Sequence, residues 1–123
     1  MEWIQLIYLY IGLAGSLGAI SRYLVGILFF SNSLFPFATL LVNLVGCYAL
    51  TFLTSRFFSL SSQLKTVIGT GFLGSFTTFS ALSVETVELF EQGKMLLAFL
   101  YIVVSIVGGI FMSNLGWKKE VME

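Results

Sequence analysis

Four long apolar segments occupy most of the 123-residue chain, and they constrain its fold more than any other feature. An α-helix needs about 20 apolar residues to cross the hydrocarbon core of a bilayer, and each segment is long enough. Because 58% of the residues are hydrophobic and only 10% are charged, the chain cannot cover a water-facing surface with polar groups. We therefore predict an all-α protein of the cell membrane, in which residues 1–123 form one domain of four transmembrane helices. The predicted spans are residues 3–30, 37–58, 64–90 and 95–117.

The content of charged and metal-binding residues argues against several classes of function. The chain has no histidine, and its six acidic residues are scattered, which leaves little for a metal site or for acid–base catalysis. We therefore do not expect an enzyme. The formal net charge is zero, so nucleic acid is not an expected partner. The single cysteine, Cys47, lies inside an apolar run, and we interpret it as a small packing residue.

The stretch GTGFLGSFTTFSALSVE, residues 69–85, differs from an ordinary lipid-facing helix. Three glycines within it each lower helix propensity by roughly 1 kcal/mol relative to alanine, and five hydroxyl side chains follow closely. We predict that the third helix breaks here. Broken backbone is tolerated at membrane depth only where it is buried in protein or lines a cavity, so the break indicates a functional site.

Polar and small residues also interrupt the other spans. Thr39 and Asn43 are four residues apart and share one face of the second span, and Ser113 belongs to a polar stripe in the fourth. Arg22, beside Tyr23, either snorkels to the interface or contacts a neighbouring chain. An interhelical hydrogen bond is the simplest interpretation of Asn43. Small residues at three- and four-residue intervals predict a packing face in the first span: Gly12, Gly15, Ser16 and Ala19.

The charges near the span ends predict an orientation. If the N-terminus is cytoplasmic, the basic residues on that side are Arg56, Lys65, Lys118 and Lys119. The other side holds Lys94, with Arg22 assigned to neither, so we predict that both termini are inside. Trp117 and the two lysines after it are expected to anchor the last span. Glu88 and Glu91 are expected at the water interface at the end of the third span, with Gly93 closing the helix. Glu85 lies one turn deeper, and we expect it to cap the helix or pair with a cation.

The polar positions gathered on the second, third and fourth spans are uncharged, which favours an anion over a cation as the ligand. A cation is better served by carboxylates or rings of carbonyls, whereas an anion needs hydroxyls, amide N–H groups and the positive edges of aromatic rings. Phe76 and Phe79 flank the Thr77–Thr78 pair and offer such edges. The alternative is that the hydroxyls bond to their own helices and the phenylalanines are apolar bulk.

Three motifs in this order resemble the Fluc (CrcB) family of bacterial fluoride channels. They are GxxGAxxRY at residues 15–23, TLxVNxxG at 39–46 and GFxGxxTTFS at 71–80, followed by SVE ending at Glu85. The resemblance covers essentially the whole chain. It implies an antiparallel dimer with two narrow fluoride pores and passive export of fluoride that confers fluoride resistance.

The resemblance also implies roles for individual residues. The main-chain carbonyls of Gly74 and Thr77 would hold a structural Na⁺ at the centre of the dimer. Asn43 would be the pore amide, and Phe79 would present its ring edge to fluoride. The further pore positions are Thr39, Ser80, Leu82, Ser83 and Ser113. The structural or vestibule residues are Arg22 and Glu85.

The chain departs from the family pattern at two positions. The family usually shows FSTFS, whereas this chain reads FSALS, so Ala81 replaces a threonine and Leu82 replaces the second phenylalanine. A leucine has no ring edge, and a homodimer would lose one aromatic group from each pore. Since the family includes paired members that form heterodimers of fixed orientation, we hypothesise either one half of such a pair or a homodimer with an altered aromatic site. The alternative is that leucine is a tolerated variation and the charge bias is too small to fix orientation.

Two other functions compete with a fluoride channel at this point. A small four-helix drug/proton antiporter has a similar size, but its chemistry needs a carboxylate in the first span, and residues 3–21 contain none. A non-conducting partner subunit of a heterodimeric channel would share all the motifs above.

Overall fold

The chain folds into helices joined by short connections. The computed structural model describes residues 2–29, 34–57 and 59–117, and it has no strand within these ranges. The elements in chain order are α1 (Glu2–Leu28), α2 (Phe37–Arg56), α3 (Ser62–Thr66), the π-helix η1 (Val67–Leu73), α4 (Gly74–Phe76), α5 (Phe79–Glu91) and α6 (Met95–Gly116). Four stretches are long and apolar enough to cross a membrane: Glu2–Leu28, Phe37–Arg56, Ser62–Glu91 and Met95–Gly116. The prediction of an all-α protein with four membrane spans is confirmed.

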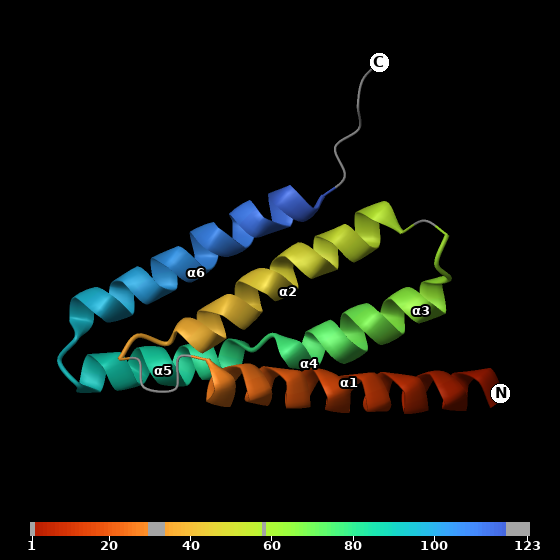
Figure 1. Cartoon of the computed structure of the whole chain (residues 1–123), viewed down its shortest axis with the longest axis horizontal. Helices are drawn as coiled ribbons and strands as arrows, with labels where there is room; N and C mark the ends of the chain where they lie inside the picture. Colours follow the sequence, from red (N-terminus) through yellow and green to blue (C-terminus); the bar gives the residue numbers. More distant parts are fainter. Residues whose placement is uncertain (1, 30–33, 58, 118–123) are drawn as a thin grey trace, which may run out of the picture.

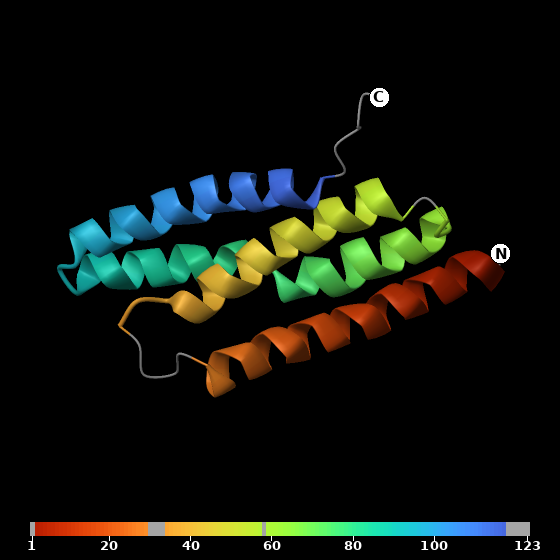
Figure 2. The ribbon, with the colours of Figure 1, turned by 45° about the horizontal axis from the view of Figure 1, so that its top comes forward.

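The spans run alternately up and down, so that successive helices are antiparallel (Figure 1). α6 lies along α2 and also contacts α5, while α1 packs along η1 and α4. Figure 2 shows the same pairs from a second direction, with α6 and α1 on opposite sides of the bundle. The first residue of α1 and the last residue of α6 therefore lie at the same end of the bundle.

The third span is not one continuous α-helix. Its first part passes through α3, η1 and α4, and α4 ends at Phe76. Thr77 and Thr78 then have extended backbone, with ψ angles of 156° and 121°, before α5 begins at Phe79. The Thr78 side chain accepts a hydrogen bond from the Ala81 amide N–H over 3.1 Å and so caps the start of α5. The extended residues thus lie in the middle of the glycine- and hydroxyl-rich stretch.

Capping residues define the two outer ends of the third span. Ser61 accepts a hydrogen bond from the Leu64 amide over 3.1 Å, so α3 begins two residues before the predicted start. At the other end Gly93 has a φ of 76°, which favours glycine, and it follows the last turn of α5 as predicted. The predicted ends of the first two spans, Phe30 and Phe58, lie outside the described residues.

Two glycines allow the third span to approach its neighbours closely. A Cβ on Gly18 would collide with the carbonyl group of Phe72, and a Cβ on Gly46 would collide with the methyl group of Thr77. The predicted packing face of the first span is therefore shifted: its tightest contact is at Gly18, whereas Gly12 has nothing within 4 Å of its Cβ position.

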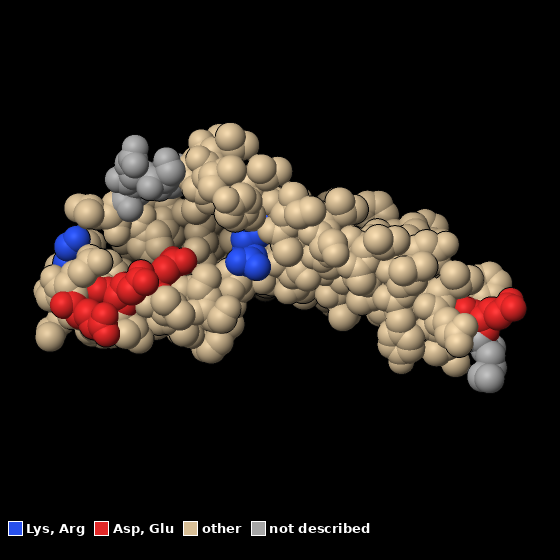
Figure 3. All heavy atoms as spheres, turned by 90° about the horizontal axis from the view of Figure 1, so that it is seen from below, with Lys and Arg blue, Asp and Glu red and all other residues tan. Residues whose placement is uncertain are grey.

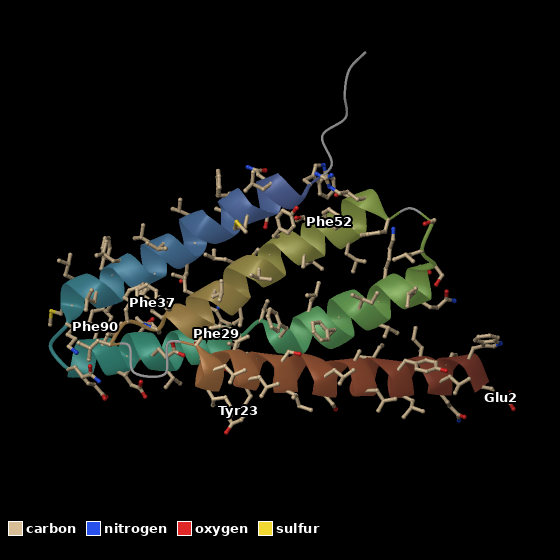
Figure 4. The ribbon with its side chains drawn as sticks, in the orientation of Figure 1. Glu2, Tyr23, Phe29, Phe37, Phe52 and Phe90 are labelled. Atoms are coloured by element: carbon tan, nitrogen blue, oxygen red, sulfur yellow. The ribbon has the colours of Figure 1, made fainter. Side chains whose placement is uncertain are left out.

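Hydrogen bonds also hold the carboxyl end of α6 against α2. The Gly116 carbonyl accepts from Arg56 Nε over 3.2 Å and from Ser55 Oγ over 3.4 Å. The Arg56 guanidinium carbon lies 5.0 Å from the centre of the Phe52 ring, within the range of a cation–π contact. Figure 4 shows Phe52 on α2 close to the end of α6. The pairing of α2 with α6 is thereby fixed at one end of the bundle.

The buried core is small and the outer surface is mostly apolar. Ala98 and Tyr101 of α6 have no exposed surface, and Leu89 of α5 packs with them. Most large apolar side chains point outward, like Tyr23 in Figure 4, as expected of a surface that contacts lipid or another subunit. Charged side chains gather at the ends of the face seen in Figure 3, apart from one basic group between them. Glu88 and Glu91 are exposed.

Candidate functional site

Asn43 of α2 binds the backbone at the interruption of the third span. Its Nδ2 donates to the Thr78 carbonyl over 3.0 Å, and its Oδ1 accepts from the Thr78 amide N–H over 2.8 Å. Both ends of the side-chain amide are therefore used on one extended residue. The interpretation of Asn43 as an interhelical hydrogen-bonding residue is correct. In addition, this pair of bonds supplies the partners that Thr78 lacks outside a helix.

At the interruption, two backbone amide N–H groups also have acceptors other than those of a continuous α-helix. In an α-helix the Gly74 carbonyl would accept from Thr78, and the Thr77 carbonyl would accept from Ala81. Here the Thr78 amide donates to Asn43, and the Ala81 amide donates to the Thr78 hydroxyl. The Gly74 and Thr77 carbonyls thus lose the amide partners that a continuous helix would give them. Neutral oxygen ligands suit a hard cation such as Na⁺, so the residues present fit the predicted ion.

A cavity of about 410 Å³ adjoins the interruption. Its lining combines polar groups of the interruption with apolar side chains of α2, α5 and α6. The predicted site residues on its wall are Asn43, Gly74, Thr77, Phe79 and Leu82. Phe79 is 80% exposed in the single chain although it lines this cavity. The structure therefore brings these five predicted residues together around one space.

Ser105 of α6 lines the same cavity and is absent from the predicted site. Its Oγ is buried and has no hydrogen-bond partner among the described residues. Serines inside helices usually bond to the carbonyl four residues earlier, as Ser16, Ser21 and Ser83 do here. A buried hydroxyl without a partner is costly, so Ser105 differs in this respect from the serines that bond to their own helices.

The Glu85 carboxylate joins three helices. Oε1 accepts from Thr39 Oγ1 of α2 over 2.6 Å, and Oε2 accepts from the hydroxyl of Tyr101 of α6 over 3.0 Å. Phe35 packs edge-on against the Tyr101 ring, with 5.4 Å between ring centres. Among the described residues, the hydrogen-bond partners of Glu85 are thus two hydroxyl groups. The sequence analysis predicted instead a helix cap or an ion pair with a cation. Tyr101 is the second site residue that sequence reasoning missed.

Arg22 reaches from α1 to the interruption. Its Nε donates over 3.1 Å to the carbonyl of Ser75, which lies within α4 and two residues before Thr77. Arg22 also lines a second cavity of about 420 Å³ together with Thr39 and Glu85. Within the described chain Arg22 therefore makes a contact inside its own bundle. This contact is compatible with the structural role that the family resemblance implied, and it differs from both the interfacial anchor and the contact to a neighbouring chain.

The other predicted hydroxyls lie apart from the first cavity. The Ser80 hydroxyl is 3.1 Å from the Thr78 hydroxyl and lines a third cavity of about 440 Å³ with Glu85 and Glu88. Ser83 is exposed and donates to the Phe79 carbonyl over 3.0 Å. Ser113 is half-buried in α6 and belongs to none of the three cavities. The predicted anchor lysines, Lys118 and Lys119, lie outside the described residues.

Together these features define a class of protein: a small multi-pass membrane protein with hydrogen-bonding side chains arranged around an interrupted helix. Among the described residues, no group of three or more His, Cys, Asp or Glu side chains could hold a metal ion. The chain belongs to the CrcB family, since the family model described as "CrcB-like protein, Camphor Resistance (CrcB)" matches residues 9–117.

Similar proteins match over nearly their whole length. The "Fluoride-specific ion channel FluC 1" of Desulfitobacterium hafniense (strain Y51) is 56% identical over 111 residues, covering 86% of this chain and 97% of that protein. A protein of the same name from Bacillus cereus (strain ATCC 14579) is 52% identical over 118 residues, covering 92% and 82%. The "Fluoride-specific ion channel FluC 2" of Listeria innocua serovar 6a is 47% identical over 113 residues, covering 89% and 86%. The family resemblance inferred from the motifs is confirmed.

Proposed function

We propose that the chain is a subunit of a fluoride-selective channel that lets fluoride leave the cell down its electrochemical gradient. The observation that carries the proposal is identity of 56% to a fluoride-specific channel over 86% of the chain. Within the chain, Asn43 holds the interrupted third span beside the exposed Phe79. The buried Ser105 hydroxyl nearby has no hydrogen-bond partner in the described part of the chain. These groups are neutral, so they can replace water around a small anion without binding it too tightly to release it.

We place the anion path beside Phe79, Ser105 and the Asn43–Thr78 pair. The positive edge of the Phe79 ring and the Ser105 hydroxyl would each face the ion as donors. Leu82 lines the same cavity without a ring edge. The hydroxyls of Thr39, Ser80, Ser83 and Ser113 would extend this path toward the two membrane surfaces, and Arg22 and Glu85 would support its walls.

The assembly we propose is an antiparallel dimer with Na⁺ between the two interruptions. The Gly74 and Thr77 carbonyls of both subunits would hold the ion, and the ion would neutralise carbonyl dipoles that face each other across the dimer. The exposed apolar surface of the single chain supports burial against another subunit, because Phe79 in particular has no cover within its own bundle. We place both termini in the cytoplasm, from the bias of basic residues.

Two forms of this dimer follow from the sequence. Leu82 and the charge bias favour a heterodimer with a paired family member, whereas a homodimer requires that conduction tolerates leucine at this position. The names of the relatives distinguish FluC 1 from FluC 2, which is compatible with paired subunits. The antiporter and the non-conducting subunit are not favoured, because the similar proteins are named as ion channels.

Growth in fluoride tests the proposal in cells. The chain would be expressed alone, and then with a paired family member, in a bacterial strain that lacks its own fluoride channels. We expect at least one of the two expressions to restore growth in fluoride, and neither should change growth in chloride. If neither restores growth although the protein reaches the membrane, the proposal is wrong. Rescue from a toxic cationic drug instead would support the antiporter.

A further inference from the structure

Arg56 joins the ends of two membrane spans at one level of the bundle. α2 ends at Arg56 and α6 ends at Gly116, side by side at the same end of the molecule (Figure 1). A Cβ on Gly116 would collide with the Tyr48 carbonyl and the Thr51 hydroxyl, so α6 lies directly on α2 here. Because both helices are candidate spans that stop at this level, we place Arg56 at one surface of the bilayer.

The guanidinium group of Arg56 is held in place on two sides. Its Nε donates to the Gly116 carbonyl over 3.2 Å, and its central carbon lies 5.0 Å from the centre of the Phe52 ring. Phe52 is itself packed between Tyr48 and Phe57, with 5.8 Å and 5.3 Å between ring centres. A side chain that is already held in one position loses less conformational freedom when it binds a ligand.

Most hydrogen-bond donors of this guanidinium point away from the bundle. Arg56 is exposed, and within the part of the chain that the structure describes it has no hydrogen bond besides the one to Gly116 and no ion pair. Arg22, in contrast, donates to the Ser75 carbonyl inside the bundle. A guanidinium carries five N–H donors in a planar fork that matches the oxygens of a phosphate group. A phosphate is therefore the ligand that the remaining donors of Arg56 fit best.

The residue after α6 indicates that this phosphate belongs to a lipid. Trp117 is exposed, and a tryptophan at the end of a span is typical of the headgroup region of a bilayer. The tail that follows, residues 118–123, holds two lysines and two glutamates, so its side chains bring no net charge. A preference for anionic lipid beside Trp117 therefore depends on Arg56 and not on the tail.

We propose that Arg56, held by Phe52 and the end of α6, binds the phosphate group of an anionic phospholipid. The exposed apolar side chains in the last turns of α6, Phe111 and Leu115, offer contacts for the acyl chains. A zwitterionic lipid has the same phosphate, but its own cation competes for it, so the anionic lipid is favoured. This site is separate from the three cavities described above, and its occupancy does not depend on passage of fluoride.

Tryptophan fluorescence tests the site directly. The chain has two tryptophans, so Trp3→Phe leaves Trp117 as the single reporter beside Arg56. The full-length Trp3→Phe protein would be placed in vesicles of phosphatidylcholine with increasing fractions of phosphatidylglycerol brominated on an acyl chain or, in parallel, of brominated phosphatidylcholine. Because bromine quenches tryptophan only at short range, the two curves give the relative affinity for the two lipids. The matched control is Lys94→Gln, which removes a cation that precedes α6 at the opposite end.

In the Trp3→Phe parent we expect a preference for phosphatidylglycerol of roughly fivefold, which weakens as salt is added. Arg56→Gln should abolish the preference, and Lys94→Gln should retain it. Size-exclusion chromatography checks folding, and if Arg56→Gln does not fold, Arg56→Lys replaces it. The lysine keeps the charge but not the fork, so it should lower the preference at least about twofold.

Equal quenching by the two lipids in the folded parent protein overturns the inference. A preference that the folded Arg56 variant retains in full overturns it as well, because the anionic lipid would then be held by other groups. Inorganic phosphate added at constant ionic strength should leave the preference unchanged. If it removes the preference, the site takes a soluble phosphate and the assignment to lipid is wrong.

Discussion

Asn43→Ala removes both hydrogen bonds that hold Thr78 in its extended conformation. A hydrogen bond contributes about 1 kcal/mol net in proteins and a similar or smaller amount between membrane helices, so the two bonds together stabilise the interruption by roughly 2 kcal/mol. Since 1.4 kcal/mol is a factor of ten, the population with Thr78 correctly held should fall by roughly thirtyfold. The Gly74 carbonyl would then compete for the Thr78 amide, because no other partner replaces Asn43.

The assay for this variant is fluoride efflux from liposomes with equal amounts of folded protein. We expect the initial rate for Asn43→Ala to fall by at least about tenfold, while the elution volume in size-exclusion chromatography is unchanged. The matched control is Asn114→Ala, which removes an amide from an exposed position of α6 and should conduct like the parent chain. Parent-like flux in Asn43→Ala would refute the argument that this amide organises the site.

Three further substitutions test other parts of the structure. Phe79→Ile removes a ring edge from a side chain that is 80% exposed, so fluoride flux should fall with little change in thermal stability. The control Phe99→Ile changes a side chain that is 61% exposed on α6 and should alter neither flux nor stability. Equal flux in the two variants would argue against a role for the Phe79 ring. Gly18→Ala should lower the free energy of unfolding by about 1–3 kcal/mol through overpacking, whereas Gly12→Ala should not. Thermal melts in detergent compare the two variants, and equal melting temperatures would contradict the close approach of α1 to η1. Tyr101→Phe keeps the buried ring but removes the hydroxyl that donates to the Glu85 carboxylate. The free energy of unfolding should fall by about 1.5–3 kcal/mol, and an unchanged melting temperature would contradict this hydrogen bond.

The spans could be predicted from the sequence because their signal is local. A run of about 20 apolar residues has few alternatives to a membrane helix, and the predicted spans agree with the helices to within two residues at each described end. Asn43 was also identifiable, since an amide inside such a run needs a partner. Its partner was not identifiable, because Thr78 lies 35 residues further along the chain.

The residues that sequence analysis missed depend on contacts between distant segments. Ser105 lies within an apolar run, and only the cavity beside it distinguishes it from a serine that bonds to its own helix. Tyr101 would pass for an interfacial aromatic residue until Glu85 of α5 is placed against it. Similarly, the spacing of small residues in the first span predicted a packing face, but only the position of the Phe72 carbonyl identifies Gly18 as its tightest point.

The central claim of the account is selective passage of fluoride, and efflux from liposomes tests it most directly. Vesicles loaded with fluoride and chloride would contain the chain alone or together with a paired family member, and ion-selective electrodes would follow both anions. The account predicts rapid fluoride release, with chloride release no faster than from empty vesicles, in at least one of the two preparations. Equal release of both anions, or no fluoride release from either preparation of folded protein, would contradict it.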